Sequence, residues 1–203
     1  MSIWEAKRRY AISYAEIGGK EGTITQASLF TPRFTVENPV SVDSNPASKE
    51  SCYEKCKAKK ATHREVTCYA ESRDGIHWVK PKLGLFEFNG SKENNIVIDG
   101  VGTHCFVAFK DGNPASLPEA RYKGIARGLP IGKKGLYIYE SPDGIHWKLT
   151  RDEPVITEGA FDSQNLAFWD EHTQQYREYH RSFVNGIRAI MTGTSSDFIN
   201  WSE

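Results

Sequence analysis

The sequence lacks the long apolar stretches that membrane insertion requires. No run of about 18 apolar residues occurs in the 203 residues, so no transmembrane helix is predicted. The opening residues, MSIWEAKRRY, are not followed by an apolar segment and do not resemble a secretory signal peptide. We therefore predict no membrane partner. The localisation stays open, since a longer form of the chain could be secreted or periplasmic.

An excess of charge of either sign is also missing. Lys and Arg together number 26, as do Asp and Glu, so the formal net charge is zero. Nucleic-acid-binding proteins usually carry a basic excess, and membrane-surface proteins carry a basic face. The balance predicts no nucleic-acid partner and favours a neutral ligand or another protein.

Cysteine is scarce, with four in the chain. Cys52 and Cys56 are spaced as half of a zinc site or as a redox pair, but no second Cys or His pair lies nearby to complete a zinc site. Cys68 and Cys105 lie in apolar segments, where a small buried thiol is usual. The sequence therefore predicts no metal site and no cofactor.

An internal repeat is the strongest feature that is present. Segments 71–78 and 140–147, ESRDGIHW and ESPDGIHW, agree at seven of eight positions. A third copy at 194–201, TSSDFINW, keeps the Ser, Asp, Ile and Trp. The tryptophans that end the copies lie roughly 50–70 residues apart, a spacing typical of propeller blades with insertions and too long for helical solenoids or leucine-rich repeats.

Each copy has the chemistry of a tight hairpin turn. Asp-Gly between two β-rich runs is a strong turn signal in the first two copies, because Gly adopts positive φ without strain. The Ser and Asp side chains can accept hydrogen bonds from backbone N–H groups of the turn. We expect the tryptophans to pack between neighbouring sheets and to be substantially buried. The turn aspartates, which we do not interpret as catalytic, are Asp74, Asp143 and Asp197.

Short β-branched or aromatic runs bounded by Gly, Pro or Asp separate the hairpins, as is typical of strands. Two successive units show the same order of runs, and four antiparallel strands are what a propeller blade requires. No convincing helix appears. Strands are predicted near residues 66–71, 104–110, 121–127, 135–141, 164–169, 176–182 and 187–194.

This order divides the chain into blades. Residues 104–156 form one blade, 162–203 most of the next, and 66–98 the outer half of a preceding one. Residues 1–65 lack the repeat and stay unassigned, as a loop-rich or poorly ordered segment in which Tyr10–Tyr14 could form a displaced strand. Propellers close with about four to eight blades. About three blades indicate a partial chain, which we expect to self-associate through its open blade edges.

The third hairpin resembles the S-D-L-x-x-W hairpin of the five-bladed β-propeller glycoside hydrolases, the arabinanase/β-xylosidase and invertase/levanase groups. Segments 66–78, 84–95 and 159–169 are similar to those of bacterial glycosyl-hydrolase-like five-bladed propellers, so the likeness covers residues 66–203. It implies an all-β, five-bladed propeller of the glycosidase type. It also implies an active site where the innermost strands converge at one end of the central channel, built from three carboxylates of successive blades.

Asp162 is the principal candidate for this site. It precedes the predicted inner strand of the last unit, which would place its carboxylate at the channel mouth, where Gln164 or Asn165 could bind sugar hydroxyls. The alternative is that Asp162 caps a turn. The matching place in the preceding unit holds His104 instead of an acid. His104 is either a sugar-binding or acid/base group acting near neutral pH, or a half-buried structural residue.

The second strand of the last unit supplies the other candidates. Tyr176, Glu178 and His180 share one face of it, and Glu178 is the candidate general acid, with surface pairing to Arg177 or Arg181 as the alternative. Arginines that could anchor a carboxylate-bearing sugar are Arg121, Arg127, Arg181 and Arg188. The predicted catalytic residues are Asp162 and Glu178, and the predicted substrate-binding residues are His104, Gln164, Asn165, His180, Arg181 and Arg188.

Two functions follow from the resemblance. The first is hydrolysis of glycosidic bonds in an oligosaccharide or polysaccharide by paired carboxylates. The second is a non-catalytic propeller that binds carbohydrate or protein at the channel mouth. The carboxylate expected from the earliest blade would lie before residue 66, where no matching motif appears. We therefore expect no hydrolysis from this chain alone.

Overall fold

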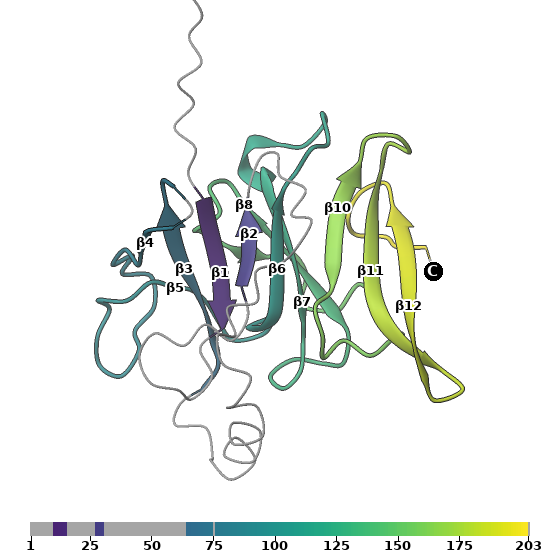
Figure 1. Ribbon diagram of the computed structural model, residues 1–203, viewed down its shortest axis with the longest axis horizontal. Coiled ribbons are helices and arrows are strands. Elements are labelled where there is room, and N and C mark those ends of the chain that lie inside the picture. The colour runs from purple at the N-terminus through teal and green to yellow at the C-terminus, as the bar shows by residue number, and fades with distance from the viewer. Residues whose placement is uncertain (1–9, 16–26, 31–63, 75, 203) are drawn as a thin grey trace, which may run out of the picture.

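The computed structural model describes residues 10–15, 27–30, 64–74 and 76–202, with side chains described from residue 64 onward (Figure 1). These residues form three antiparallel sheets and no α-helix, and a single 3₁₀ turn, η2, spans Pro118–Ala120. None of the described elements is a helix with the length and apolarity needed to cross a membrane. The predicted all-β class is confirmed.

The first sheet has the strand order β2-β1-β3-β4, and β5 also pairs with β3. Both β1 and β2 lie within residues 1–65, which lack the repeat, and β1 confirms the displaced strand expected near the start of that segment. The other residues of that segment up to position 63, including Cys52 and Cys56, lie outside the described residues. The bounds are Tyr10–Ala15 for β1, Ala27–Phe30 for β2, Val66–Ser72 for β3, Trp78–Val79 for β4 and Ile96–Asp99 for β5.

The second and third sheets are simple meanders. Their orders, β6-β7-β8-β9 and β10-β11-β12, follow the chain, as the repeated order of apolar runs predicts. The bounds are His104–Lys110 for β6, Tyr122–Arg127 for β7, Leu136–Ser141 for β8, Lys148–Leu149 for β9, Leu166–Asp170 for β10, Gln175–Val184 for β11 and Ile187–Ser195 for β12. All seven predicted strands are present within about two residues of their expected ends.

The second sheet is packed on both faces. Because successive side chains of a strand point to opposite faces, Phe106 and Ala108 pack with Tyr69 of the first sheet, whereas Val107 packs toward the third. The buried side chains of β7 and β8 alternate between the same two faces. Figure 1 accordingly shows the sheets side by side, and β6 contacts β1 and β2 on one side and β10 on the other. Burial of both faces explains why this part of the sequence reads as nearly continuous apolar runs.

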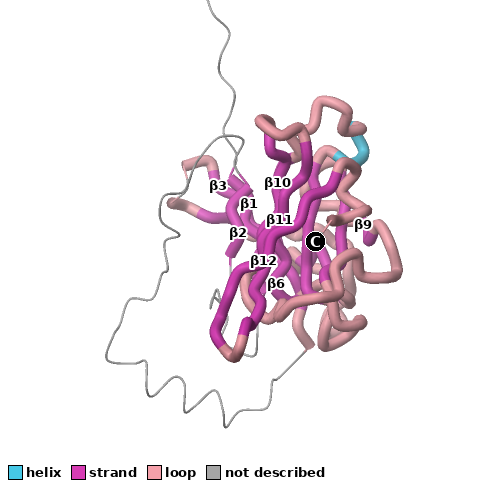
Figure 2. The backbone as a smooth tube through the Cα atoms, turned by 90° about the vertical axis from the view of Figure 1, so that its right-hand side faces the viewer, coloured by secondary structure: helices cyan, strands magenta, loops and turns pink. Residues whose placement is uncertain are grey.

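The third sheet is packed on one face only. On β11, Tyr176, Glu178 and His180 are buried, and Tyr176 packs with core residues of the second sheet, while Tyr179 and Phe183 point the other way and are exposed. Figure 2 shows this outer face, with β10, β11 and β12 in front. No other element of the described chain covers it.

The three hairpins have the predicted chemistry. In the second hairpin, Asp143 Oδ1 accepts hydrogen bonds from the backbone N–H groups of Ile145 and His146 at 2.9 and 2.8 Å. The same pair of bonds recurs at Asp74 and Asp197. All three aspartates are therefore turn residues. The hairpin tryptophans are only half-buried, less than expected, because the rings of Trp147 and Trp201 each lie back over their own turn and donate from Nε1 to a turn carbonyl.

Candidate functional site

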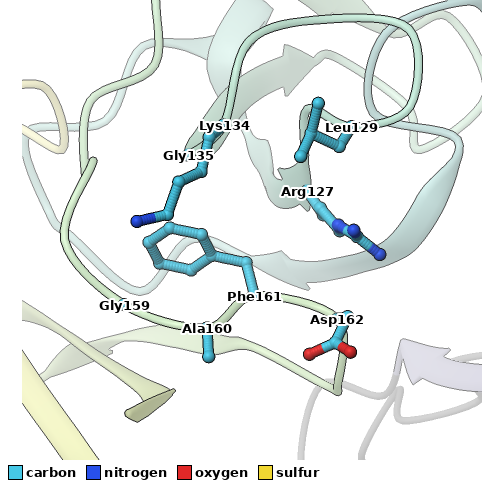
Figure 3. A pocket seen from close by; sticks show the side chains of 8 residues that line it. All are labelled: Arg127, Leu129, Lys134, Gly135, Gly159, Ala160, Phe161 and Asp162. Carbon is cyan, nitrogen blue, oxygen red and sulfur yellow. The ribbon is translucent and has the colours of Figure 1, made fainter. Parts of the chain in front are cut away.

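A small pocket opens where the second sheet meets the loop that precedes β10. Its volume is about 170 Å³. The end of β7 and the β7–β8 loop form one wall, and residues 159–162 form the other (Figure 3). The lining residues are Arg127, Leu129, Lys134, Gly135, Gly159, Ala160, Phe161 and Asp162.

Packing and hydrogen bonds hold the 159–162 loop in place. The backbone N–H of Ala160 donates to the carbonyl of Arg181 at 2.8 Å, and the buried ring of Phe161 lies 5.1 Å from that of His180. Gly159 has a φ of +139°, and a Cβ at this position would come within 2.6 Å of His180 Nε2. Only glycine fits both the backbone angle and the close approach. The loop therefore presents Asp162 from a fixed backbone.

Asp162, the principal candidate from the sequence, is accessible at the edge of this pocket. Its side chain is 53% exposed and forms an ion pair with Arg181, whose own side chain is 18% exposed. The guanidinium of Arg181 also lies 5.3 Å from the centre of the Phe183 ring. Among the described residues, no backbone N–H donates to the Asp162 carboxylate, so the turn-cap alternative finds no support. Arg181, which was predicted to bind substrate, is therefore engaged in an ion pair with Asp162.

Glu178 and His180 form a buried pair beneath the loop. Glu178 is 1% exposed, and its carboxylate lies 2.8 Å from Nδ1 of His180, which is 3% exposed. The alternative that Glu178 pairs with a surface arginine is wrong, because its strand face packs against the second sheet. Neither residue lines the pocket. This geometry supports a structural role that holds His180 against Gly159 and Phe161.

His104 lies beside the pocket wall and is held by a residue that sequence analysis missed. Its Nδ1 is 2.9 Å from a carboxylate oxygen of Glu65, and His104 pairs across the strands with Arg127. Hydrogen bonds to the Cys105 side chain and to Glu65 raise the pKa of His104 to about 10, against the opposing effect of burial. At neutral pH this histidine is a fixed cation, so its expected role as an acid/base near neutrality is not supported.

The remaining predicted residues divide between core and surface. Asn165 is fully buried, and its amide donates to the carbonyls of Phe161 and Ser163, so it shapes the loop. Gln164 is exposed beside the loop. Arg188 is exposed opposite Phe183 near the tip of the β11–β12 hairpin, outside the pocket lining.

Glu65, Lys134 and Phe161 belong to this region but were not among the residues predicted from the sequence. Phe161 directly precedes Asp162, so its position in the pocket wall could have been predicted from the sequence. No sequence signal links residue 65 to residue 104. Within the described part of the chain, no three His, Cys, Asp or Glu side chains cluster as a metal site would need.

Comparison with models of known protein families and with curated proteins gave no match for this chain. Its function is therefore inferred from the fold and from the pocket.

Proposed function

We propose that this chain is part of a five-bladed β-propeller of the glycoside hydrolase type, and that the pocket beside Asp162 binds a carbohydrate. Three features support the scaffold: the repeated hairpin, the meander order of the strands, and the packing of three sheets along β6 and β10. Loops at strand ends commonly carry the binding residues of such scaffolds.

The exposed carboxylate of Asp162 carries the proposal. It is paired with Arg181 and stands at the rim of a pocket that contains Phe161, and the exposed part of the carboxylate can also accept hydrogen bonds from sugar hydroxyls. The hairpin aspartates, in contrast, are engaged by the backbone of their own turns. Asp162 is therefore the carboxylate whose removal should change ligand binding.

Binding is a better account of this chain than hydrolysis. Glycoside hydrolysis needs two carboxyl groups that face the scissile bond, about 5–5.5 Å apart for retention or about 6.5–9.5 Å for inversion. The second predicted carboxylate, Glu178, is buried against His180 and lies outside the pocket lining. Hydrolysis by a larger propeller, with a further carboxylate from another blade, is the second candidate function.

The test is a titration of the whole chain with a panel of neutral and acidic oligosaccharides, measured by isothermal calorimetry. We expect Asp162→Asn to weaken binding by about tenfold or more, since hydrogen bonds to a charged group contribute about 1.5–3 kcal/mol. Glu171→Gln, which changes an exposed carboxylate in the β10–β11 turn, is the matched control and should have no effect. Failure of every oligosaccharide to bind would refute the proposal. Release of reducing sugar that Asp162→Asn abolishes would instead establish the hydrolase.

A further inference from the structure

The pocket contains more positive charge than its carboxylates neutralise. Arg127 is half-buried in one wall, and no described residue forms an ion pair or hydrogen bond with its guanidinium. Lys134, an exposed residue of the same wall, likewise has no such partner among the described residues. Figure 3 shows both side chains at the pocket, on the side opposite the Asp162 loop. The chain as a whole has a net charge of zero, so this excess is local.

The carboxylates beside these cations are already engaged. Asp162 is paired with Arg181, and Glu65 is paired with His104, the cross-strand partner of Arg127. Neither carboxylate is therefore free to neutralise Arg127. A partly buried charge without a partner is costly, and an anionic ligand would remove that cost.

The shape of the site limits the kind of anion. A guanidinium presents paired N–H donors in a planar fork, which matches the two oxygens of a carboxylate or of a sulfate group. The cavity of about 170 Å³ is smaller than the roughly 300–1,000 Å³ of pockets for drug-sized ligands. It suits a single sugar unit or its charged substituent rather than a long segment of polysaccharide.

We propose that the pocket selects sugars that carry an anionic substituent, a carboxylate or a sulfate group, and that Arg127 binds this substituent. The positive charge of Lys134 at the rim also attracts the anionic substituent. Asp162 accepts hydrogen bonds from the hydroxyls of the same sugar. The inference rests on the proposed carbohydrate binding, since it names the class of sugar that the same pocket recognises.

The experiment compares matched ligands on the whole chain. Methyl galactoside, methyl galacturonide and methyl galactoside 6-sulfate differ only in the group at carbon 6. We expect at least one of the two anionic sugars to bind about tenfold or more tightly than the neutral sugar, and this preference to shrink as salt rises from about 0.05 to 0.5 M because salt screens the charges. The sugar that is preferred identifies whether carboxylate or sulfate is recognised.

Variants then test whether Arg127 causes the preference for anionic sugars. Arg127→Gln should reduce binding of the anionic sugar to the level of the neutral one, and Arg127→Lys should restore part of the preference because it keeps the charge but loses the fork. Arg151→Gln, which changes an exposed arginine after β9 and outside the pocket lining, is the matched control and should leave the preference intact. Circular dichroism of each variant checks that the sheets are retained.

The outcomes separate this inference from the proposed function. Equal affinities for the neutral and anionic sugars would overturn the inference and leave carbohydrate binding in place. A preference that survives Arg127→Gln would also overturn it. If acetate or sulfate alone binds as tightly as the anionic sugars and no neutral sugar binds, an anion site stands but carbohydrate recognition fails.

Discussion

Replacement of Asp143 by Ala tests whether the repeated hairpin stabilises the sheets. Asp143 Oδ1 accepts two backbone N–H bonds, and its Oδ2 lies 2.7 Å from Nδ1 of His146. Ser141, which is fully buried, donates its hydroxyl to the same carboxylate and accepts from the N–H of Gly144 at 2.9 Å. The substitution removes the acceptor for the two backbone N–H groups, the His146 ring and the Ser141 hydroxyl. It leaves the bonds that the Ser141 hydroxyl and the Gly144 carbonyl accept.

The expected loss is about 1–2 kcal/mol of unfolding free energy. Hydrogen bonds to charged groups contribute about 1.5–3 kcal/mol when they are buried. The Asp143 side chain is 43% exposed, so solvent screens these bonds and water can replace part of them. Comparable carboxylate caps at helix N-termini lose about 0.5–2 kcal/mol on change to Ala. With an m-value of about 2 kcal/mol/M, the urea midpoint should fall by about 0.5–1 M.

The assay is urea unfolding followed by tryptophan fluorescence and by circular dichroism. Asp197→Ala removes the same set of turn bonds in the third sheet and should give a similar loss. Ser141→Ala leaves the buried N–H of Gly144 without its acceptor and should also destabilise the chain. Glu171→Ala is the surface control. A loss at Asp143 below about 0.5 kcal/mol, within the range of ordinary surface changes, would refute the reasoning.

Three further predictions follow from the described contacts. Trp147→Ala should cost about 2–4 kcal/mol in the same urea assay, less than full burial would give, because the ring is half-buried against Phe106 at 4.9 Å. Burial raises the pKa of Asp143, but hydrogen bonds from the backbone and side chain of His146 oppose this effect. The resulting pKa is lowered to about 2. Its contribution to stability is then present above about pH 4 and lost as the pH falls toward 2, which urea midpoints measured against pH will show, and Asp143→Asn should flatten that dependence. The uncovered face of the third sheet, where Tyr179 and Ile190 are exposed, should drive self-association in analytical ultracentrifugation, and Ile190→Asp should reduce it.

Sequence patterns predicted the fold where the physical signal is local. A strand such as β6 is recognisable because β-branched and aromatic residues fill consecutive positions between turn residues. The hairpins were predictable for the same reason, since Ser141 and Asp143 bond to backbone groups within three residues. The pairing of β1 with β3 was not predictable, because it joins segments separated by more than 50 residues and has no turn to fix its register.

The candidate site was predictable only in part. The position of Asp162 before a strand was predictable from the sequence, whereas the pocket that it lines together with Arg127 depends on how two sheets pack. The pairing of Glu65 with His104 joins two sheets and depends on how those sheets pack, which no local pattern encodes. The burial of Glu178 was missed because strand alternation says which residues share a face and is silent on which face is covered.

The differences between the repeats separate scaffold from site. Every sheet must close its own hairpin, so the Ser and Asp of the turn recur in all three units with the same hydrogen bonds. The pocket occurs between the second sheet and the loop that precedes β10, so its residues have no structural reason to repeat in every unit. His104, at the start of β6, and Asp162, shortly before β10, hold matching places in successive units and are chemically unlike. In a repeat protein of this kind, the positions that break the pattern at the strand ends are therefore the ones whose substitution should change ligand binding without unfolding the sheets.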